Sequence, residues 1–476
     1  MDAFRISGGF PLSGEVRVNG AKNAALPQMA ASLLTDRPVT LHEAPRLSDL
    51  DNMARLLGEL GVETRWSDAS TDQANRGGTL HLCAIDETKS HARYDIVRTM
   101  RASICVLGPL LARRGEARVS MPGGCVIGDR PIDLHLRGLR ALGAEITLDA
   151  GDIVARAPKT ATGERRLRGA RVFMGGAFGS TVLGTANLMS AATLARGETV
   201  IECAACEPEI ADLAALLKTM GARITGAGAP RIIIEGVDSL TGVDHTVIPD
   251  RIEAGTLLAA IGATNGDAVL RNCPYDAMAG QIDRFEEAGL QVELSGPAPD
   301  MLRASVRVRR RTGAITPARI TTQPHPGFPT DVQAQAMAML ALGKGISVVT
   351  EKIFPERFLH VAELSRMGAS LFRQGPTVVV NGVDHLVGAP VMASDIRASA
   401  GLVVAGLAAK GETTVRRVYH LDRGYESLER CLRAMGARIE RIRGEAVVDD
   451  LAEPAARAAT MVGDAIKSEH VGAGAI

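Results

Sequence analysis

The sequence has few aromatic residues, no net charge and no long apolar segment. Aromatic residues make up 3% of its 476 positions, and its 54 basic side chains balance 54 acidic ones. Without a net positive field the chain is not expected to bind nucleic acid, and any anion site must be built locally. No apolar run is long and uninterrupted enough to span a bilayer, so no membrane partner is expected either.

The cysteines and the N-terminus favour a cytoplasmic protein. Seven cysteines, an odd number, are scattered without the spacing of a disulfide framework, which is typical of a reducing compartment. Cys203 and Cys206 form a lone C-x-x-C with no second pair, so no zinc or other metal site is predicted. The first residues, Met1 to Arg5, lack the apolar stretch of a signal peptide.

One pattern recurs along the chain. An apolar helix end, a glycine, a small or apolar residue and a strand follow one another six times. Glycine fits the position just after a helix, where the backbone turns before the strand. The chain is too long for one ordinary core, and six copies divide naturally into two domains of three. The glycines of the pattern are Gly61, Gly143, Gly221, Gly289, Gly368 and Gly436.

Each repeat also contains a helix that is apolar on nearly all sides, which predicts burial inside a domain. These helices are expected over residues 23–34, 101–112, 181–195, 253–263, 331–342 and 397–409. Routine capping explains the Asp, Ser and Thr residues at the starts of these helices. It does not explain Lys22, Arg101, Arg397 or nearby Arg130, because cations are unfavourable at helix N-termini. If the helix N-termini of two domains face each other, they form an anion-binding cleft.

Cys125 lies in a Gly-rich run from Pro122 to Pro131, five residues before Arg130. A nearby guanidinium favours the thiolate and binds phosphate or carboxylate groups. The alternative is a small buried cysteine in a tight turn. The residue types of this run leave both interpretations open.

At these residues the chain resembles the UDP-N-acetylglucosamine 1-carboxyvinyltransferase family, the enolpyruvyl transferases of peptidoglycan synthesis. The resemblance covers roughly residues 1–445. It is carried by Gly20-Ala21-Lys22-Asn23, Thr99 to Ser103, Pro122 to His135, Glu207-Pro208-Glu209, Pro249 to Glu253, Pro324 to Asp331, Arg357, Asp395 to Arg397 and Asp422 to Glu426.

The resemblance implies an α/β (α+β) fold of two inside-out α/β barrel domains, each of three βαβαββ repeats, with the active site in the interdomain cleft. The N-terminal domain is expected to span residues 22–248. The C-terminal domain is expected to combine residues 1–21 with 249–446, followed by a partly disordered tail, 447–476.

The implied reaction transfers enolpyruvyl from phosphoenolpyruvate to the 3′-OH of UDP-N-acetylglucosamine and releases phosphate. The implied catalytic residues are Cys125 as proton donor and target of fosfomycin, Asp331 as general base, Lys22 and Arg397. The implied phosphoenolpyruvate ligands are Lys22, Asn23, Arg130 and Arg423 around the phosphate, and Arg357 and Arg397 at the carboxylate. The implied nucleotide-sugar ligands are Arg101, Arg130, Pro131, Ile132, Asp133, Leu134, Asp331 and Ile353.

No metal or organic cofactor is implied, since Lys and Arg side chains with helix ends can supply the anion site. Four acidic residues in the motifs are expected to be structural rather than catalytic. They are Glu207, Asp250, Glu253 and Asp395.

One stretch departs from the family pattern. The family's nucleotide-diphosphate loop has a Lys followed by Ser-Val-Gly, whereas the Gly-rich loop 175–184 is slightly longer and has no Lys. Backbone N–H groups leading into a helix can still bind phosphate. Two alternatives therefore stay open: a transferase like 5-enolpyruvylshikimate-3-phosphate synthase with a smaller acceptor, and a non-catalytic nucleotide-sugar-binding protein.

Overall fold

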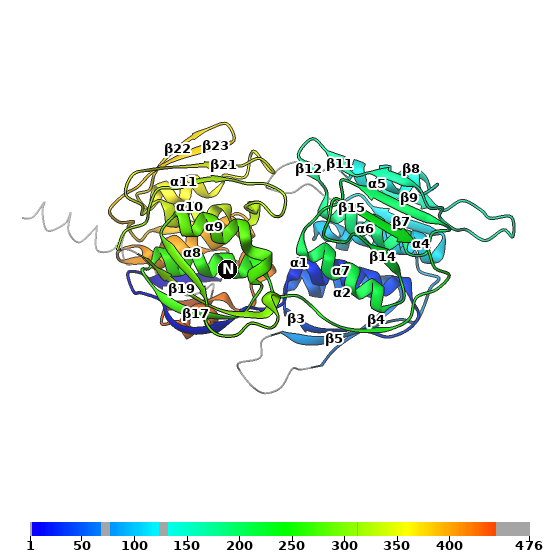
Figure 1. Cartoon of the computed structure of the whole chain (residues 1–476), viewed down its shortest axis with the longest axis horizontal. Coiled ribbons are helices and arrows are strands. Elements are labelled where there is room, and N and C mark those ends of the chain that lie inside the picture. Colours follow the sequence, from blue (N-terminus) through cyan, green and yellow to red (C-terminus); the bar gives the residue numbers. More distant parts are fainter. Residues whose placement is uncertain (1, 68–76, 123–131, 312, 444–476) are drawn as a thin grey trace, which may run out of the picture.

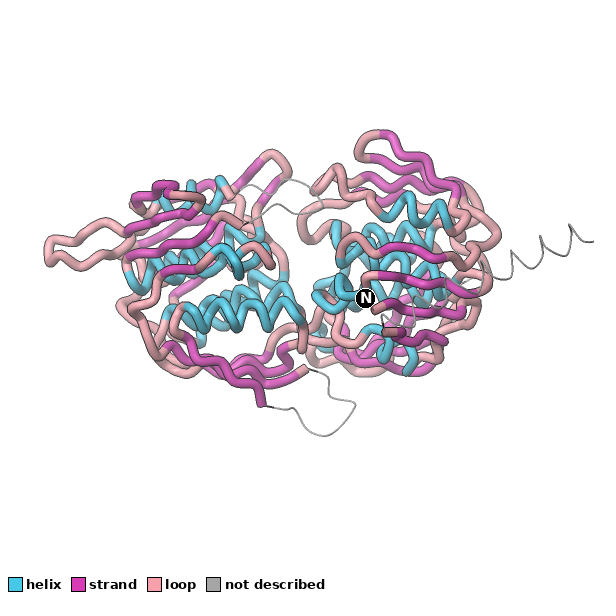
Figure 2. Tube along the Cα trace, turned by 180° about the vertical axis from the view of Figure 1, so that it is seen from behind, coloured by secondary structure: helices cyan, strands magenta, loops and turns pink. Residues whose placement is uncertain are grey.

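Helices lie inside the structure and sheets cover them (Figure 2). The computed structural model describes residues 2–67, 77–122, 132–311 and 313–443. Two halves lie side by side along the long axis of the molecule (Figure 1). The first half has its core between Ala21 and Val247, and the core of the second combines residues 4–18 with residues 252–439. This arrangement confirms the predicted fold class.

The described residues form six four-stranded sheets, three in each half, and all six share one topology. In each sheet one edge strand pairs in parallel with its neighbour, and the other two pairs are antiparallel. Sheets of this kind repeat one βαβαββ unit, which explains the pattern that recurs in the sequence.

The first half has three sheets, each given in the order of its paired strands. The first consists of β16 (Val243–Thr246), β3 (Val39–Ala44), β5 (Gly78–Ala84) and β4 (Val62–Ser67), and the second of β6 (His91–Ala92), β7 (Glu116–Ser120), β9 (Asp152–Arg156) and β8 (Glu145–Asp149). The third consists of β10 (Arg171–Phe173), β13 (Glu198–Glu202), β15 (Arg231–Glu235) and β14 (Arg223–Thr225). A two-residue turn joins the short strands β11 (Gly175–Gly176) and β12 (Gly179–Ser180) into a hairpin.

The second half also has three sheets. The first consists of β2 (Ser13–Arg17), β17 (Asp267–Cys273), β19 (Ala304–Arg310) and β18 (Leu290–Leu294), and the second of β20 (Arg319–Thr321), β21 (Ile346–Thr350), β23 (Thr377–Asn381) and β22 (Ser370–Gln374). The third consists of β24 (Pro390–Met392), β25 (Glu412–Arg416), β1 (Ala3–Ser7) and β26 (Arg438–Ile442). Both N-terminal strands therefore complete sheets whose other strands lie far along the chain, within residues 390–442 for β1 and within residues 267–310 for β2.

The inner helices occupy the segments that the sequence predicts to be buried. Every residue of α8 is buried, so this helix has no solvent-facing side. Helices α8, α10 and α12 pack on one another in the second half, and α1 and α4 both pack on α6 in the first. The inner helices are α1 (Lys22–Ala31), α4 (Leu107–Arg114), α6 (Val182–Ala192), α8 (Arg251–Ala263), α10 (Gln333–Leu340) and α12 (Ile396–Ala408).

The outer helices bury one stripe each. In α2, residues Leu50, Met53, Leu56 and Leu57 are buried at the spacing of a single helix face. The outer helices are α2 (Ser48–Glu59), α3 (Tyr94–Val97), α5 (Asp133–Ala141), α7 (Pro208–Thr219), α9 (Ala279–Glu287), α11 (His360–Arg366) and α13 (Leu428–Ala434).

The helix predicted over residues 101–112 differs most from its prediction. Residues Arg101–Val106 form a 3-10 helix, η2, and the α-helix begins only at Leu107. Pro109 explains the start, because proline has no N–H and is tolerated in the first turn of an α-helix. The other 3-10 helices are η1 (Ser32–Leu34), η3 (Tyr275–Met278), η4 (Met301–Arg303), η5 (Thr330–Val332) and η6 (Val418–Arg423).

Two chain segments cross between the halves next to each other. Gly20 and Pro249 form an isolated bridge, Ala21 donates to Ile248, and Asp250 donates to Asn19. Glu253 then accepts from both the backbone and the side-chain nitrogen of Asn19. These bonds fix the starts of α1 and α8, one from each half, at the seam between the halves.

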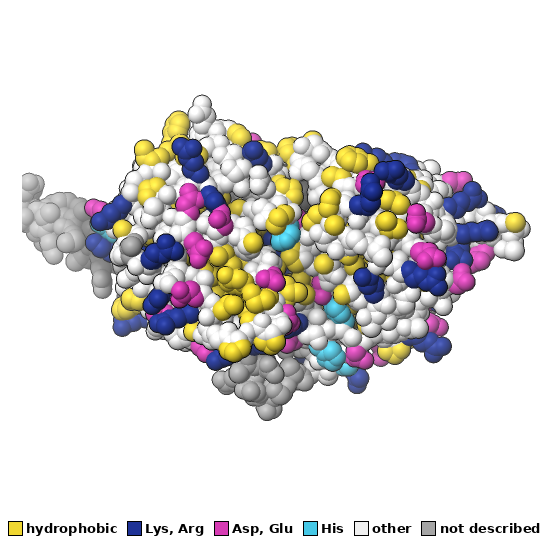
Figure 3. Space-filling model, in the orientation of Figure 1, with side chains coloured by type: hydrophobic (Ala, Val, Ile, Leu, Met, Phe, Trp, Pro, Cys, Tyr) yellow, Lys and Arg dark blue, Asp and Glu magenta, His cyan; other side chains and the backbone are white. Residues whose placement is uncertain are grey.

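Charges of both signs are mixed on the surface seen in Figure 3. Lys and Arg side chains are interspersed with Asp and Glu on the face seen in Figure 3. Among the described residues, no helix combines the length and the apolar character needed to cross a membrane.

Candidate active site

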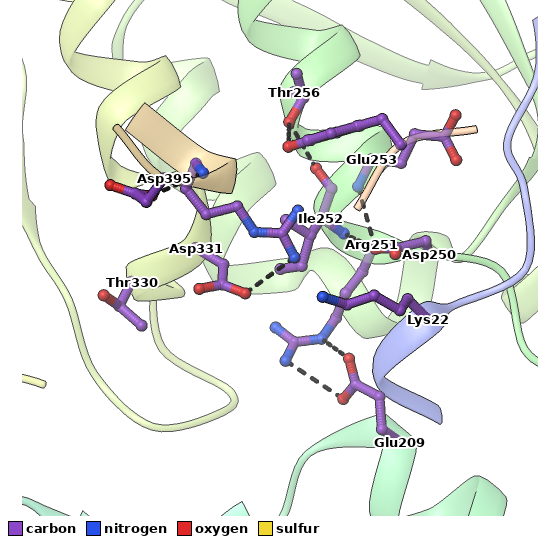
Figure 4. A network of polar contacts seen from close by, with 12 residues as sticks. Lys22, Glu209, Asp250, Arg251, Ile252, Glu253, Thr256, Thr330, Asp331 and Asp395 are labelled. Carbon is purple, nitrogen blue, oxygen red and sulfur yellow. Dashed lines mark hydrogen bonds and ion pairs between the residues drawn. The ribbon is translucent and has the colours of Figure 1, made fainter. Parts of the chain in front are cut away.

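Polar residues from both halves meet where the inner helices begin (Figure 4). Asp250 caps α8 by accepting from Ile252 and Glu253, and Asp395 caps α12 by accepting from the backbone of Arg397. Capping thus accounts for these two carboxylates. It does not account for the cations that open α1 and α12, because those side chains pair with carboxylates from other elements.

Asp331 joins two buried arginines of the second half. Its Oδ1 lies 2.7 Å from Arg357 Nη1, and its Oδ2 lies 3.1 Å from Arg397 Nη2. Burial lowers the pKa of Arg397, but Asp331 and other acidic neighbours outweigh it and raise the pKa overall. Arg397 Nη1 is buried and makes no hydrogen bond to the described parts of the chain, so one donor of this guanidinium is available to an anion.

Asp49 joins a second pair of cations, one from each half. Its Oδ2 lies 3.1 Å from Lys22 Nζ, and its Oδ1 lies 2.9 Å from Arg423 Nε. Burial alone would raise the pKa of Asp49, but Lys22 and Arg423 lower it overall. Burial lowers the pKa of Lys22, and this effect outweighs the rise that the neighbouring Asp49 carboxylate causes. Asp49 therefore holds two cations together that would otherwise repel each other.

Two further contacts close the seam beside these groups. Arg251, at the start of α8, forms a bidentate pair with Glu209, with N–O distances of 3.0 and 3.3 Å (Figure 4). Glu207 accepts from the backbone N–H of His325, in the other half, at 3.3 Å. Burial raises the pKa of Glu207, whose second oxygen has no partner among the described residues.

The start of α5 is held by a buried polar cluster. Burial, reinforced by Arg101, lowers the pKa of His135 to about 3, so its ring is neutral near pH 7. The ring Nδ1 lies 3.1 Å from Asn187 Nδ2, and Asn187 also bonds to the backbone of Ile104 and Gly108. The cluster thus links α5, which includes Asp133 and Leu134 and directly follows Ile132, through Asn187 to Ile104 of η2, the element that begins at Arg101.

Similar proteins identify the family. A curated protein of Xanthobacter autotrophicus, "UDP-N-acetylglucosamine 1-carboxyvinyltransferase", is 50% identical over 446 residues, which cover 93% of this chain and 100% of that protein. One of the same name from a Chelativorans species is 49% identical over 445 residues, with the same coverage. The family model for EPSP synthase (3-phosphoshikimate 1-carboxyvinyltransferase) matches residues 6–432.

The chain belongs to the EPSP synthase family. It is therefore an enzyme, a carboxyvinyltransferase, as the resemblance in its sequence predicts. Solved structures share the fold of this family. The enolpyruvyl transferase NikO from Streptomyces tendae has a TM-score of 0.79 at 24% identity, covering 93% of this chain and 99% of that one. EPSP synthase from Acinetobacter baumannii has a TM-score of 0.70 at 15% identity, covering 93% and 100%.

The structure of this family member brings together many of the predicted site residues. Lys22, Asp331, Arg357, Arg397 and Arg423 contribute to the two ion-pair groups at the seam. Asn23 is half-buried in the first turn of α1, beside Lys22. The predicted Cys125, Arg130, Pro131 and the tail 447–476 lie outside the described residues. No group of three or more His, Cys, Asp or Glu side chains in the described parts of the chain has the geometry of a metal site.

Sequence reasoning missed Asp49 and the pairing of Arg251. Asp49 lies on the apolar stripe of α2, four residues before Met53 and seven before Leu56, and it is buried with them. A charged residue on a buried helix face is uncommon without a partner, and that was the available signal. Its partner Arg423 is 374 residues away in the chain, so no local pattern could have named it.

Asp49→Asn tests whether this carboxylate holds the cation pair. Breaking a buried ion pair leaves Lys22 without a counter-charge, so the free energy of unfolding should fall by about 3 kcal/mol. Inorganic phosphate, which can lie between the two cations in place of the carboxylate, should raise the melting temperature of the variant more than that of the wild type. Differential scanning calorimetry with matched phosphate and chloride solutions measures both effects.

Asp51→Asn is the matched control, because Asp51 is an exposed carboxylate on the same helix turn. Equal stability and equal phosphate response in Asp49→Asn, Asp51→Asn and the wild type would contradict the role given to Asp49.

Proposed function

We propose that the enzyme transfers the enolpyruvyl group of phosphoenolpyruvate to the 3′-OH of UDP-N-acetylglucosamine and releases phosphate. The names of its relatives at about 50% identity over nearly the whole chain support this acceptor. The reaction is the first committed step of peptidoglycan synthesis. It would place the enzyme in the cytoplasm, in cell-wall biogenesis, and thereby in the control of cell shape and division.

The observation that carries the proposal is the presence of two separate cation pairs at one seam. Phosphoenolpyruvate has a phosphate and a carboxylate on one small molecule, and each suits a pair of closely held cations. In the proposal Lys22 and Arg423, with Arg130 and Asn23, bind the phosphate. Arg357 and Arg397 bind the carboxylate, and Nη1 of Arg397, which bonds to none of the residues that the structure describes, supports this role.

Asp331 has a second part in this scheme. Its carboxylate already bonds to the two arginines assigned to the substrate carboxylate, at 2.7 and 3.1 Å. When phosphoenolpyruvate takes over these guanidinium groups, Asp331 loses ion-pair partners and becomes a better proton acceptor. Binding of the first substrate would thus prepare the base that deprotonates the hydroxyl of the second.

In the proposed reaction the acceptor first adds to phosphoenolpyruvate, and phosphate is then eliminated. The acceptor oxygen forms a bond to C2 of phosphoenolpyruvate while its proton passes to Asp331, and C3 takes a proton from Cys125. The C–O bond to phosphate then breaks as C3 returns a proton to the Cys125 thiolate, which restores the double bond, and the proton held by Asp331 leaves with the phosphate. Arg101, Arg130, Pro131, Ile132, Asp133, Leu134 and Ile353 are proposed to hold the nucleotide sugar, so that the 3′-OH faces Asp331.

A product assay tests the reaction directly. We expect the purified enzyme, given phosphoenolpyruvate and UDP-N-acetylglucosamine, to release phosphate and form an enolpyruvyl nucleotide sugar that mass spectrometry identifies. Product only with shikimate 3-phosphate would assign the other acceptor of the family. Binding of the nucleotide sugar without any product would instead indicate a non-catalytic binding protein.

Asp331→Asn tests the base. Turnover should fall by roughly 10²- to 10⁴-fold, the usual contribution of a general base. Affinity for phosphoenolpyruvate should be retained or increased, because a neutral amide competes less for Arg357 and Arg397. Steady-state kinetics and a binding titration measure the two effects. Asp384→Asn, at an exposed loop position, is the control, and full turnover in Asp331→Asn would remove this residue from the base role.

Cys125 gives a chemical test of the predicted proton donor. Fosfomycin should alkylate this thiol, and the reaction should be faster with UDP-N-acetylglucosamine bound. Peptide mass spectrometry locates the adduct among the seven cysteines. An adduct on another cysteine, or none at all, would exclude Cys125 from the proposed role.

A further inference from the structure

The hairpin of β11 and β12 lies between the two halves of the molecule. A Cβ at Gly176 would lie 3.2 Å from Leu134 Cδ1 in the first half, and a Cβ at Gly179 would lie 3.1 Å from Pro324 Cγ in the second. Figure 1 shows the hairpin at the side of the first half that faces the second. Gly179 also has a φ of +101°, so glycine fits this position for its conformation as well as its size.

The tip of the hairpin forms one wall of a cavity of about 410 Å³. The tip residues are Ala177 and Phe178, and Phe178 is 61% exposed although it is a large apolar side chain. The opposite wall belongs to the second half and includes Pro324, Lys352 and Ile353. Ile353 is a predicted nucleotide-sugar contact, so the cavity adjoins the proposed acceptor site.

Glu351 holds the opposite wall in place. It is fully buried, and its Oε1 accepts from Thr322 Oγ1 and from the backbone of Ile353 and Phe354, while its Oε2 accepts from Thr330. With four donors directed at it, the charge of the carboxylate is stabilised within the turn. The turn leaves the side chain of Lys352 exposed at the cavity.

Lys352 is the one cation among the described residues that line this cavity. No hydrogen bond or ion pair joins its ammonium group to another residue in the described parts of the chain, whereas most arginines near the seam are paired. The hairpin itself has no cation between Gly175 and Ser180. A ligand with negative charge in this cavity would therefore find its only lysine on the half opposite the hairpin.

We propose that Lys352 and Phe178 bind the diphosphate-bearing part of the acceptor from opposite sides of this cavity. Lys352 supplies the positive charge that the hairpin lacks, and Phe178 covers the apolar side of the ligand and excludes water. This inference rests on the proposed nucleotide-sugar acceptor. It makes both residues determinants of specificity for a nucleoside diphosphate sugar, because an acceptor with no diphosphate would leave Lys352 without a partner.

Lys352→Gln and Phe178→Ala test the inference in the full-length enzyme. Each variant has a matched control. For Lys352→Gln it is Lys344→Gln, at an exposed lysine that follows the C-terminal end of α10, and for Phe178→Ala it is Phe372→Ala, at an exposed ring on β22. Loss of a charge-assisted hydrogen bond should weaken binding of UDP-N-acetylglucosamine by roughly tenfold in Lys352→Gln. The affinity for UDP should fall by the same factor, whereas the KM for phosphoenolpyruvate and kcat should stay unchanged. Phe178→Ala should raise the KM for the nucleotide sugar alone.

Isothermal titration calorimetry with UDP-N-acetylglucosamine and with UDP separates the possible failures. If the wild type binds neither, the proposed function itself is wrong. If the wild type binds both and Lys352→Gln equals Lys344→Gln, the function stands and the role of Lys352 is wrong. A loss for UDP-N-acetylglucosamine without a loss for UDP would place the lysine against the sugar and overturn its assignment to the diphosphate.

Discussion

The site depends on the cost of burying positive charge. Lys22, Arg357 and Arg397 are buried in a protein of zero net charge, and a buried cation without a counter-charge would destabilise the fold by several kcal/mol. Asp49 and Asp331 meet this need in the unliganded enzyme by pairing with two cations each. The carboxylates therefore hold these cations together in the absence of any bound anion.

The fold supplies the place where these pairs form. Each inner helix is buried on nearly all sides, so its ends are the positions where it presents polar groups. The sheets lie outside, and the helices α1 and α8 begin at the two adjacent crossings between the halves. Helix starts from both halves thus meet at one seam, where free N–H groups and partial positive charge already favour anions. The cations add full positive charge at the helix starts, where the backbone already supplies partial positive charge.

The ion pairs also connect the halves. Asp49 and Glu209 belong to the first half, and each bonds to an arginine of the second, Arg423 and Arg251. A substrate phosphate that draws on Lys22 and Arg423 would act on the same contact that holds the halves together. In the proposed function, substrate binding and the relative position of the halves would be coupled through these shared charges, and Asp331 would couple substrate binding to the preparation of the base.

Much of this could be predicted from the sequence, and the limits have physical causes. The six repeats, the buried helices and the cations at helix starts follow from local periodicity and composition, so they were visible without a structure. The 3-10 start of the segment at Arg101 was not, because Pro109 shifts the α-helix by a few residues within a pattern that still looks helical. Asp49 was missed because a carboxylate in the first turn of a helix is usually explained by the helix dipole.

The sequence by itself determined the repeat unit, the family and the chemical types of the site residues, because these depend on short-range patterns and on motifs a few residues long. Only the tertiary structure decided which charges pair, that β1 and β2 complete distant sheets, and that Phe178 and Lys352 line one cavity. Those outcomes depend on contacts between residues far apart in the chain, such as the 374 positions that separate Asp49 from Arg423. A contact of that kind has no local signal, since its energy exists only after both halves have folded and met.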